Sequence, residues 1–485
     1  METLEFERRP LPPEAKRKLI EIVGAKGYLD KPEDLLLYEY DGSVDKAKPE
    51  MVVFPQSTEQ VSAIVKATEE FGVPIVGRGA GTGLSGGAIP RVGGVIIGFS
   101  RMNKILEIDL ENERMVVQPG VVNLDISLAV QEMGYFYAPD PSSQRACTIG
   151  GNVSENAGGP HTLAYGVTTN HVLGLEFVLP DGTIHETGGK ELDSPGYDLV
   201  GLLTGSEGTM VLVTKVIVRL MRQPEKIKTI LAIYNSASDC ADTVAQITAR
   251  AITPVAVEML DGEMLRMVEE ATHAGYPMDA AAVLLIELEG LVEAVEEQTE
   301  QIRQVCEQCG AREFRVAKTA DERDLLWKGR KNAFGAVGRV SSSYYVQDGV
   351  VPRTQIAPTL RYIGEVAKKY NLGISNIFHA GDGNMHPIIL FNARIPDELE
   401  RAKNAGEAIL SYCISVGGSI TGEHGVGMEK NELMAQLFKP DTLDYIGRFK
   451  TLFDPSGRLN PGKVLPTGKG CLEIRQAPFS ARTAI

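Results

Sequence analysis

Short apolar runs separated by turns fill the first half of the chain. They predict strands near residues 51–54, 73–76, 95–97, 115–117, 173–179 and 210–220. Helices are predicted at 13–23 and 32–40, and an amphipathic helix begins at the capping box Ser57-Thr-Glu-Gln60 and ends at Gly72. This mixture of elements indicates an α+β fold.

The second half alternates apolar strands with long acidic helices. A charged, proline-containing segment at 221–229 precedes it and predicts a domain boundary. Beyond this segment, the pattern predicts strands at 284–288, 376–378 and 388–391 and helices at 292–309, 397–416 and near 430–437. We therefore expect a second domain in which helices pack on a sheet.

Glycine is concentrated in three segments of the first domain, at 77–87, 148–159 and 205–209. Backbone N–H groups in such segments can point at one anion, and Arg78, Thr82 and Ser85 could add donors. Residues 81–86 match the dinucleotide-binding fingerprint, but Ala88-Ile-Pro does not start the helix that this fingerprint requires. That excludes a nicotinamide-type Rossmann fold. One cluster alone could be a flexible surface loop, whereas three favour a long cofactor that touches several loops.

Two histidines flank a strong turn signal in the second domain. Asp382-Gly383 is typical of the tip of a two-residue hairpin. With these residues at the tip, His379 lies directly opposite His386, with Cβ atoms roughly 5 Å apart. Two neutral imidazoles at this separation can bind one divalent metal. The alternative is an ordinary cross-strand aromatic pair in a sheet.

A further glycine-rich segment, 417–427, contains Glu423 and His424. Glu423 would complete a site of two histidines and one carboxylate that leaves positions open for substrate. The adjacent His424 would then be free to act as a base. The alternative is a glycine turn after a helix, with both side chains solvated.

Composition narrows the functional classes. The 485 residues are 43% hydrophobic and carry a net charge of -15, which indicates a folded protein and argues against a nucleic-acid partner. No apolar run approaches the roughly 18 residues that span a bilayer. The N-terminus has no apolar core of a secretory signal, and six cysteines make no disulfide framework. We expect a cytoplasmic protein with free thiols.

The glycine segments GRGAGTGLSGG, PDPSSQRACTIGGNVSENAGG and LLTGSEGTMVLVTKV resemble the FAD-binding domain of the vanillyl-alcohol-oxidase type, also called the PCMH type. HAGDGNMHP and GGSITGEHGVG resemble the C-terminal half of FAD-linked D-2-hydroxy-acid dehydrogenases and oxidases, among them the glycolate oxidase FAD subunit and D-lactate dehydrogenase. The resemblance covers roughly residues 45–467. It implies an N-terminal helical segment (1–45), an FAD-binding domain (46–224), a substrate or cap domain on an antiparallel sheet with helices and the metal site (225–427), and a C-terminal segment (428–485) that returns to the FAD domain and ends in a loose tail (468–485).

The resemblance also implies which residues contact FAD. Non-covalent FAD is expected, because residues 79–87 contain neither the histidine nor the cysteine that attaches flavin in some relatives. The positions carried over for FAD are Arg78, Gly79, Gly81, Thr82, Gly83, Leu84, Ser85, Pro139, Asp140, Ser142, Thr148, Gly150, Gly151, Asn152, Asn156, Gly158, Gly159, Tyr165, Gly166, Glu207, Gly208 and Asn460.

By the same resemblance, His424 is the catalytic base and Arg330 clamps the substrate carboxylate, a group that the planar guanidinium suits. The metal ligands are His379, His386 and Glu423, and Zn, Mn and Fe all fit this ligand set. The expected reaction passes a hydride equivalent from a 2-hydroxy acid to FAD and gives a 2-keto acid.

Two features of the sequence bear on the substrate and on the electron acceptor. The hydroxyglutarate enzymes carry a lysine and an asparagine where this chain has Val346 and Ile388, which favours a small acid, glycolate or D-lactate. Cys306-x-x-Cys309 is a single pair and no iron–sulfur pattern, so electrons must leave through oxygen, a quinone or a partner. The family implies FAD-like and iron–sulfur partner subunits and a peripheral place on the inner face of the membrane. A homodimer is a further expectation.

Four other functions remain open from the sequence. A D-2-hydroxyglutarate-type dehydrogenase would act on a larger acid. An oxidase of a phenol or an alkyl-glycerone phosphate on the same fold would need no metal. A non-enzymatic flavin-binding subunit would not need the two histidines and Glu423 together. A zinc hydrolase without flavin would be colourless and would leave the glycine segments unexplained.

Overall fold

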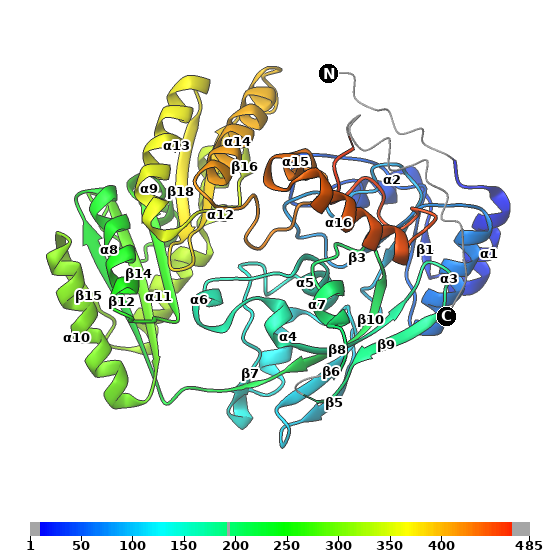
Figure 1. Ribbon diagram of the computed structural model, residues 1–485, viewed down its shortest axis with the longest axis horizontal. Coiled ribbons are helices and arrows are strands. Elements are labelled where there is room, and N and C mark those ends of the chain that lie inside the picture. The colour runs from blue at the N-terminus through cyan, green and yellow to red at the C-terminus, as the bar shows by residue number, and fades with distance from the viewer. Residues whose placement is uncertain (1–9, 192–194, 468–485) are drawn as a thin grey trace.

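The computed structural model describes residues 10–191 and 195–467. Two parts lie side by side in Figure 1: an N-terminal part (10–222, joined by 428–467) and a cap (226–427). The predicted tail 468–485, with Cys471, lies outside the described residues. The mixture of two smaller sheets and one large antiparallel sheet, all with helices, confirms the predicted α+β fold.

A four-stranded sheet begins the N-terminal part. Its three longer strands are parallel and its short edge strand is antiparallel. The helices α1 and α3 pack on it through an apolar core that includes Leu19, Ile64 and Ile75. The side chain of Ser57 caps α3 by accepting the N–H of Gln60. In sheet order the strands are β1 (Tyr28–Leu29), β2 (Met51–Val53), β4 (Val95–Gly98) and β3 (Ile75–Arg78), and the helices are α1 (Pro13–Val23), α2 (Pro32–Leu35), η1 (Leu36–Tyr38) and α3 (Thr58–Glu70).

A five-stranded antiparallel sheet completes the N-terminal part. Short helices cover it and carry two of the glycine segments towards the cap. In sheet order its strands are β5 (Ile105–Asp109), β6 (Arg114–Val117), β10 (Leu212–Arg219), β8 (Val172–Val178) and β9 (Ile184–Gly188), and β7 (Tyr135–Phe136) pairs with β11 (Met221–Arg222). The helices are α4 (Asn123–Leu128), η2 (Gln131–Met133), α5 (Ile149–Glu155), α6 (Thr162–Tyr165), η3 (Thr168–His171) and α7 (Leu199–Leu203).

The cap is built on an eight-stranded antiparallel sheet with an apolar core on each face. Because both faces are covered, strands such as β14 are apolar over nearly their whole length. In sheet order the strands are β15 (Ala311–Val316), β12 (Lys226–Tyr234), β14 (Ala282–Gly290), β13 (Ala256–Asp261), β18 (Gly373–His379), β19 (Asn384–Phe391) and β16 (Ser343–Val346), and β17 (Gly349–Val350) pairs with β19. One face carries α8 (Ala237–Ala249), α10 (Val292–Gln308), η4 (Arg353–Gln355), α13 (Ile356–Tyr370) and α14 (Glu398–Ser415); the other carries α9 (Gly262–Thr272), α11 (Ala320–Lys331) and α12 (Ala333–Val340).

The register of the β18–β19 hairpin differs from the sequence prediction. A two-residue turn at Asp382-Gly383 with His379 opposite His386 is wrong. His379 pairs with Asn384, and His386 pairs with Ile377, so that all four residues between the strands form the loop. The two histidines are therefore diagonal neighbours. They still share one face of the sheet, because residues two apart on a strand point the same way.

Contacts that local sequence cannot show favour this longer loop. Asp382 accepts the N–H of Asn384 at 3.0 Å, which closes the turn from inside. The carbonyl of Gly383 accepts the N–H of Val351, also at 3.0 Å, from the strand region beside the hairpin. The prediction from the Asp-Gly pair considered the turn alone, whereas the neighbouring chain fixes its length.

The chain ends by returning from the cap to the N-terminal part (Figure 1). This segment contains η5 (Asn431–Leu433), α15 (Met434–Leu437) and α16 (Pro440–Phe453). Leu459 then forms a parallel bridge with Ile75, and the N–H of Asn460 donates to the Ile75 carbonyl at 2.8 Å. The return strand thus ties the C-terminal segment to the sheet that precedes the first glycine segment.

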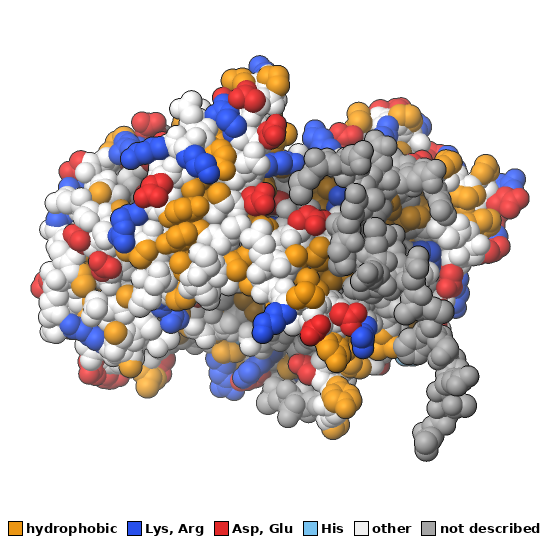
Figure 2. Space-filling view, turned by 45° about the horizontal axis from the view of Figure 1, so that its top comes forward, with side chains coloured by type: hydrophobic (Ala, Val, Ile, Leu, Met, Phe, Trp, Pro, Cys, Tyr) orange, Lys and Arg blue, Asp and Glu red, His pale blue; other side chains and the backbone are white. Residues whose placement is uncertain are grey.

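The surface shows no basic patch on the face in Figure 2, where Lys and Arg side chains are interspersed with Asp and Glu. Among the helices that the structure describes, none is long and apolar enough to cross a membrane. The five described cysteines are free.

Candidate functional site

A cavity of about 430 Å³ is lined by residues of both the N-terminal part and the cap. All three glycine segments reach it, and so do the predicted ligand and base side chains. The predicted residues in its lining are Arg78, Gly79, Gly81, Thr82, Gly83, Leu84, Ser142, Thr148, Gly150, Gly151, Asn152, Gly158, Glu207, Gly208, Arg330, His379, His386, Glu423 and His424. Segments more than 300 residues apart in the sequence therefore converge on one space.

The glycine-rich wall has the features of a cofactor cradle. A Cβ added at Gly79 would lie 2.3 Å from Thr148 Oγ1, and Gly81 has φ +72° and would press a Cβ against the Arg78 guanidinium. Side chains at these positions would distort the wall. The buried atoms Arg78 Nη1, Thr148 Oγ1 and Glu155 Oε2 have no hydrogen-bond partner in the described part of the chain. Unpaired polar atoms on a glycine-lined wall suit a long polar ligand such as FAD, because buried polar groups are otherwise paired.

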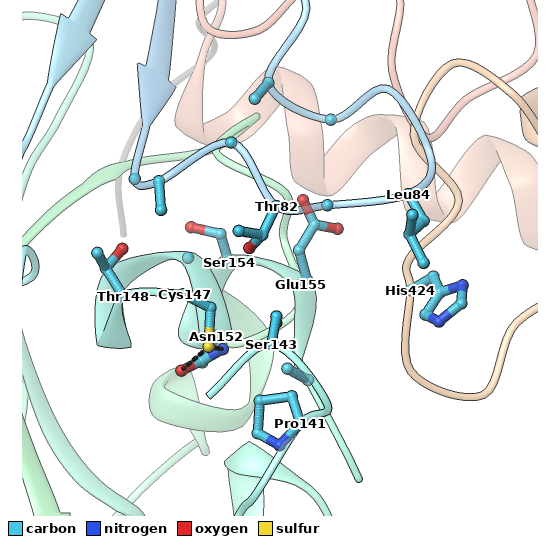
Figure 3. A pocket seen from close by; sticks show the side chains of 18 of the residues that line it. Thr82, Leu84, Pro141, Ser143, Cys147, Thr148, Asn152, Ser154, Glu155 and His424 are labelled. Carbon is cyan, nitrogen blue, oxygen red and sulfur yellow. Dashed lines mark hydrogen bonds between the residues drawn. The ribbon is translucent and has the colours of Figure 1, made fainter. Parts of the chain in front are cut away.

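Figure 3 shows how this wall faces the base. Thr148, Cys147 and Asn152 lie on one side of the view, Leu84 and His424 lie on the other, and Thr82 and Glu155 are between them. Asn152 donates a hydrogen bond to the Cys147 sulfur at 3.4 Å, so the thiol has a partner within the wall.

The remaining predicted FAD positions lie outside the cavity lining. Ser85 donates to the carbonyl of His424 at 2.8 Å. Asn460 donates to the carbonyls of Gly87 and Glu207, both at 2.8 Å. Asp140 pairs with a histidine described below. The full set is Ser85, Pro139, Asp140, Asn156, Gly159, Tyr165, Gly166 and Asn460.

The predicted metal ligands form one cluster. Glu423 Oε1 lies 3.2 Å from Nε2 of His379 and 3.2 Å from Nε2 of His386. The two imidazole rings have centroids 5.0 Å apart. Two ligand atoms bound tetrahedrally at about 2.1 Å to one ion lie about 3.4 Å apart. The cluster therefore has the size and the donor set of a divalent-metal site.

Second contacts of each imidazole leave the Nε2 atoms free for a metal. His379 Nδ1 lies 2.7 Å from Glu258 Oε1, and His386 Nδ1 lies 3.0 Å from the carbonyl of Gln347. Both partners accept hydrogen bonds, so both Nδ1 atoms carry the proton and both Nε2 atoms can offer a lone pair.

The charges of the cluster are strongly coupled. Burial raises the pKa of Glu423, but His379 and hydrogen bonds from the surrounding histidines outweigh it and hold that pKa well below its ordinary value. Burial lowers the pKa of His379, but Glu258 and Glu423 outweigh it and raise that pKa well above its ordinary value. Without metal, a proton on His379 balances the two carboxylates. A bound cation would replace that proton, as ligands must deprotonate to bind.

Asp348 organises the loop that carries Glu423 and His424. Its Oδ2 accepts the N–H of Gly422 at 3.1 Å, of Glu423 at 3.3 Å and of His424 at 2.9 Å. Burial raises the pKa of Asp348, but His424, Lys430 and His386 outweigh it and lower that pKa. The buried carboxylate thus stays charged and holds the loop.

His424 lies against the cluster, and together with Asp348 and His386 it forms a second group of side chains that could hold a metal ion. Its Nε2 is 3.6 Å from Glu423 Oε1, and its ring stacks on His386 with centroids 4.9 Å apart. Its side chain is 13% exposed and faces the cavity. His424 is therefore placed to exchange a proton with a molecule bound at the cluster.

Arg330 is buried and pairs with Glu258, its Nε lying 2.6 Å from Oε2. Its Nη2 is 3.5 Å from His379 Nδ1. Arg330 also lines the cavity. The guanidinium can therefore offer a donor to an anion beside the metal cluster.

Sequence reasoning missed several residues of the site. Phe99, Pro119, Glu155, Lys331, Phe334 and Tyr344 line the cavity, and Glu258 and Asp348 orient its functional groups. The last two had a signal: each is a charged residue inside an apolar strand region, where burial of a charge requires a partner. The cavity-lining aromatic residues had no local signal.

A second buried network joins the N-terminal part to the cap. His161 Nδ1 lies 2.9 Å from Asp140, and its Nε2 lies 3.2 Å from Glu287 on β14. Glu287 also accepts from Arg323 at 3.0 Å and from Trp327 at 2.6 Å. Burial lowers the pKa of His161, but Asp140 and Glu287 outweigh it and raise that pKa to about 10.

His161 should make stability depend on alkaline pH. Its folded pKa of about 10 exceeds the ordinary value of 6.5, so its contribution is complete below pH 6.5 and is lost as pH rises through 10. The free energy of unfolding of wild type minus that of His161→Gln should therefore fall by on the order of 2–4 kcal/mol between pH 6 and 10.5. Denaturant titration of both proteins at each pH measures it. A difference that stays constant with pH would show that His161 is not charged in the folded protein.

Comparison with known proteins agrees with the geometry. Residues 49–188 match the family described as FAD binding domain, and residues 223–464 match the FAD linked oxidases, C-terminal domain. The chain is 46% identical to the glycolate oxidase subunit GlcD of Escherichia coli (strain K12), over 91% of this chain and 89% of that protein. It is 35% identical to a D-lactate dehydrogenase of Archaeoglobus fulgidus, over 86% of this chain and 91% of that protein.

The fold has a solved counterpart. The structure of p-cresol methylhydroxylase with substrate bound superposes with a TM-score of 0.80 at 22% identity, covering 93% of this chain and 96% of that chain. This confirms the predicted vanillyl-alcohol-oxidase, or PCMH, type of fold. Taken with the two family matches and the relatives, it shows that the chain belongs to the FAD-linked oxidases and is an FAD-linked oxidoreductase.

Proposed function

We propose that this protein oxidises a small 2-hydroxy acid, glycolate or D-lactate, to the corresponding 2-keto acid with non-covalent FAD and a divalent metal. The observation that carries the proposal is the convergence on one cavity of the glycine-rich wall, the cluster of His379, His386 and Glu423, and His424. The relatives named glycolate oxidase subunit and D-lactate dehydrogenase support the substrate class.

In this proposal each polar group of the substrate has a partner. Arg330 holds the carboxylate through its guanidinium group, which lines the cavity. The hydroxyl oxygen sits at the three-ligand cluster, and His424 takes its proton. The chemistry that the bound groups supply is hydride acceptance by FAD and Lewis-acid polarisation of the hydroxyl by the metal. The substrate loses one proton and one hydride equivalent, which balances its oxidation to the keto acid.

The surroundings of the cluster support a small substrate. Val346 on β16 pairs with Ile388 on β19, and both are buried in the apolar core on that face of the sheet. These are the positions where the hydroxyglutarate enzymes carry a lysine and an asparagine. Phe334 and Tyr344 stack at 6.3 Å and line the cavity. None of these four side chains offers a charged partner to a second carboxylate, which favours a monocarboxylic acid.

The electrons leave reduced FAD through a quinone or an iron–sulfur partner in this proposal. The name of the Escherichia coli relative, a glycolate oxidase subunit, supports assembly with further subunits. The inner face of the membrane is the proposed location, with the chain bound there as a peripheral protein.

Anaerobic addition of 2-hydroxy acids to the yellow protein tests the proposal. Glycolate or D-lactate should bleach the flavin absorbance rapidly, whereas L-lactate and D-2-hydroxyglutarate should bleach it slowly. Fast bleaching by D-2-hydroxyglutarate would support the hydroxyglutarate alternative. A yellow protein that none of these acids bleaches would contradict the proposal, and a metal-free preparation oxidising a phenol would favour the other substrate class.

A further inference from the structure

Glu258 is a charged residue inside β13, a strand of the cap in which Asp261, at the end, is the other charged residue. It is 0% exposed. Its direct pairing partner across the sheet is His379 on β18. Burial of a carboxylate is costly unless partners compensate it, so its contacts are informative.

Each oxygen of Glu258 contacts a different functional group. Oε1 lies 2.7 Å from Nδ1 of His379, and Oε2 lies 2.6 Å from Nε of Arg330. Burial raises the pKa of Glu258, but Arg330 and His379 outweigh it and lower that pKa. The carboxylate is therefore charged and accepts from both partners. This contact places the proton of His379 on Nδ1 and leaves Nε2 to the metal cluster.

A neighbouring carboxylate binds the same helix without contacting a proposed metal ligand. Arg323, Trp327 and Arg330 lie on one face of α11, four and three residues apart. Glu287 on β14 binds Arg323 and Trp327, and Glu258 on β13 binds Arg330. Both carboxylates dock the helix on the sheet. Only Glu258 also contacts a proposed metal ligand.

We propose that Glu258 is a positioning residue that couples the substrate-carboxylate clamp to the metal site, one oxygen orienting Arg330 and the other orienting His379. The inference rests on the proposed function of these two groups. The inference adds that Arg330 and His379 cannot be positioned independently, because one carboxylate binds both side chains. Movement of Arg330 on substrate binding would shift Glu258 and with it His379. Loss of the carboxylate would change the positions of both Arg330 and His379.

The variant Glu258→Gln tests this coupling without changing the size of the side chain. An amide offers one acceptor and one NH₂ group. If its oxygen stays on Arg330, the NH₂ faces His379 Nδ1 and favours the tautomer with the proton on Nε2, which cannot bind metal. We expect the dissociation constant for Zn²⁺, used as the probe on chelator-treated protein, to rise about 10–100-fold. The KM for glycolate should rise as well, because the amide oxygen on Arg330 no longer carries the charge of the carboxylate.

Glu287→Gln is the matched control. It makes the same chemical change on the adjacent strand and under the same helix, and because Glu287 also contacts Thr229 and His161, it should lower the melting temperature at least as much. Its dissociation constant for Zn²⁺ should stay close to that of wild type. Glu258→Asp, which keeps the charge on a shorter side chain, should recover part of the metal affinity and provides a folded variant if Glu258→Gln does not accumulate.

The outcomes separate the two proposals. Wild-type metal affinity in both Glu258 variants would overturn the coupling while leaving the proposed function intact. Equal weakening by Glu258→Gln and Glu287→Gln would also overturn it, because the effect would then be that of a loosened helix. A wild-type protein that binds no Zn²⁺ and is not bleached by any 2-hydroxy acid would overturn the proposed function and the coupling together.

Discussion

Replacing His424 with alanine is expected to leave FAD bound and to slow flavin reduction by glycolate or D-lactate by about 10²–10⁴-fold, the usual contribution of a general base. The loop should survive the change, because Asp348 accepts the backbone N–H of His424 and Ser85 donates to its carbonyl, and both contacts remain in the variant. Stopped-flow measurement of flavin absorbance under anaerobic conditions gives the rate. The visible spectrum of the resting protein reports FAD content in the same sample.

His185→Ala is a suitable control for this prediction. His185 is an exposed histidine on β9, outside the lining of the cavity. Glycolate or D-lactate should bleach the flavin of the His185→Ala variant at the wild-type rate. Normal bleaching by His424→Ala would remove His424 from the proposed chemistry and leave the proton without an assigned acceptor. Loss of FAD from His424→Ala would instead indicate a structural role in the cofactor wall.

Removal of the metal is expected to slow flavin reduction on the order of 10³-fold, since Lewis-acid stabilisation of a developing alkoxide supplies several kcal/mol. Chelator treatment and His386→Ala should have the same effect, because His386 Nε2 is one of the three proposed metal donors, with His379 and Glu423. Metal analysis before and after treatment, together with the bleaching rate, measures it. The FAD spectrum should persist, as the glycine-rich wall contributes no metal ligand.

Adding metal back after chelation distinguishes the loss of a catalytic metal from a side effect of the chelator. Adding back Zn²⁺, Mn²⁺ or Fe²⁺ to the chelated wild type should recover the rate, and the same addition to His386→Ala should not. Full activity in a protein shown to contain no metal would contradict the proposed site. It would also remove the main physical difference between this protein and an oxidase of phenols on the same fold.

Patterns of a few adjacent residues were enough to locate the parts of the site. The glycine segments identified the cofactor wall because only glycine tolerates positions such as Gly79 and Gly81, where a Cβ would collide with neighbouring side chains. The two histidines that flank Asp382-Gly383 and the glycine-rich segment with Glu423 indicated the proposed metal cluster. The hairpin register was wrong because the prediction from Asp382-Gly383 weighed local turn preference alone, whereas Val351 from outside the hairpin helps to fix the loop.

The sequence by itself determined the α+β class, the family and the residue types that meet at the cavity, because these depend on periodicity and on short motifs. Only the tertiary structure decided which carboxylates orient the functional side chains at the cavity. Glu258, Asp348 and Glu287 reach their partners across strands, helices and domains, so no sequence spacing reveals the pairing. The physical reason is that a buried charge is stabilised by neighbours in space, and in this protein those neighbours lie between 36 and 126 residues away along the chain.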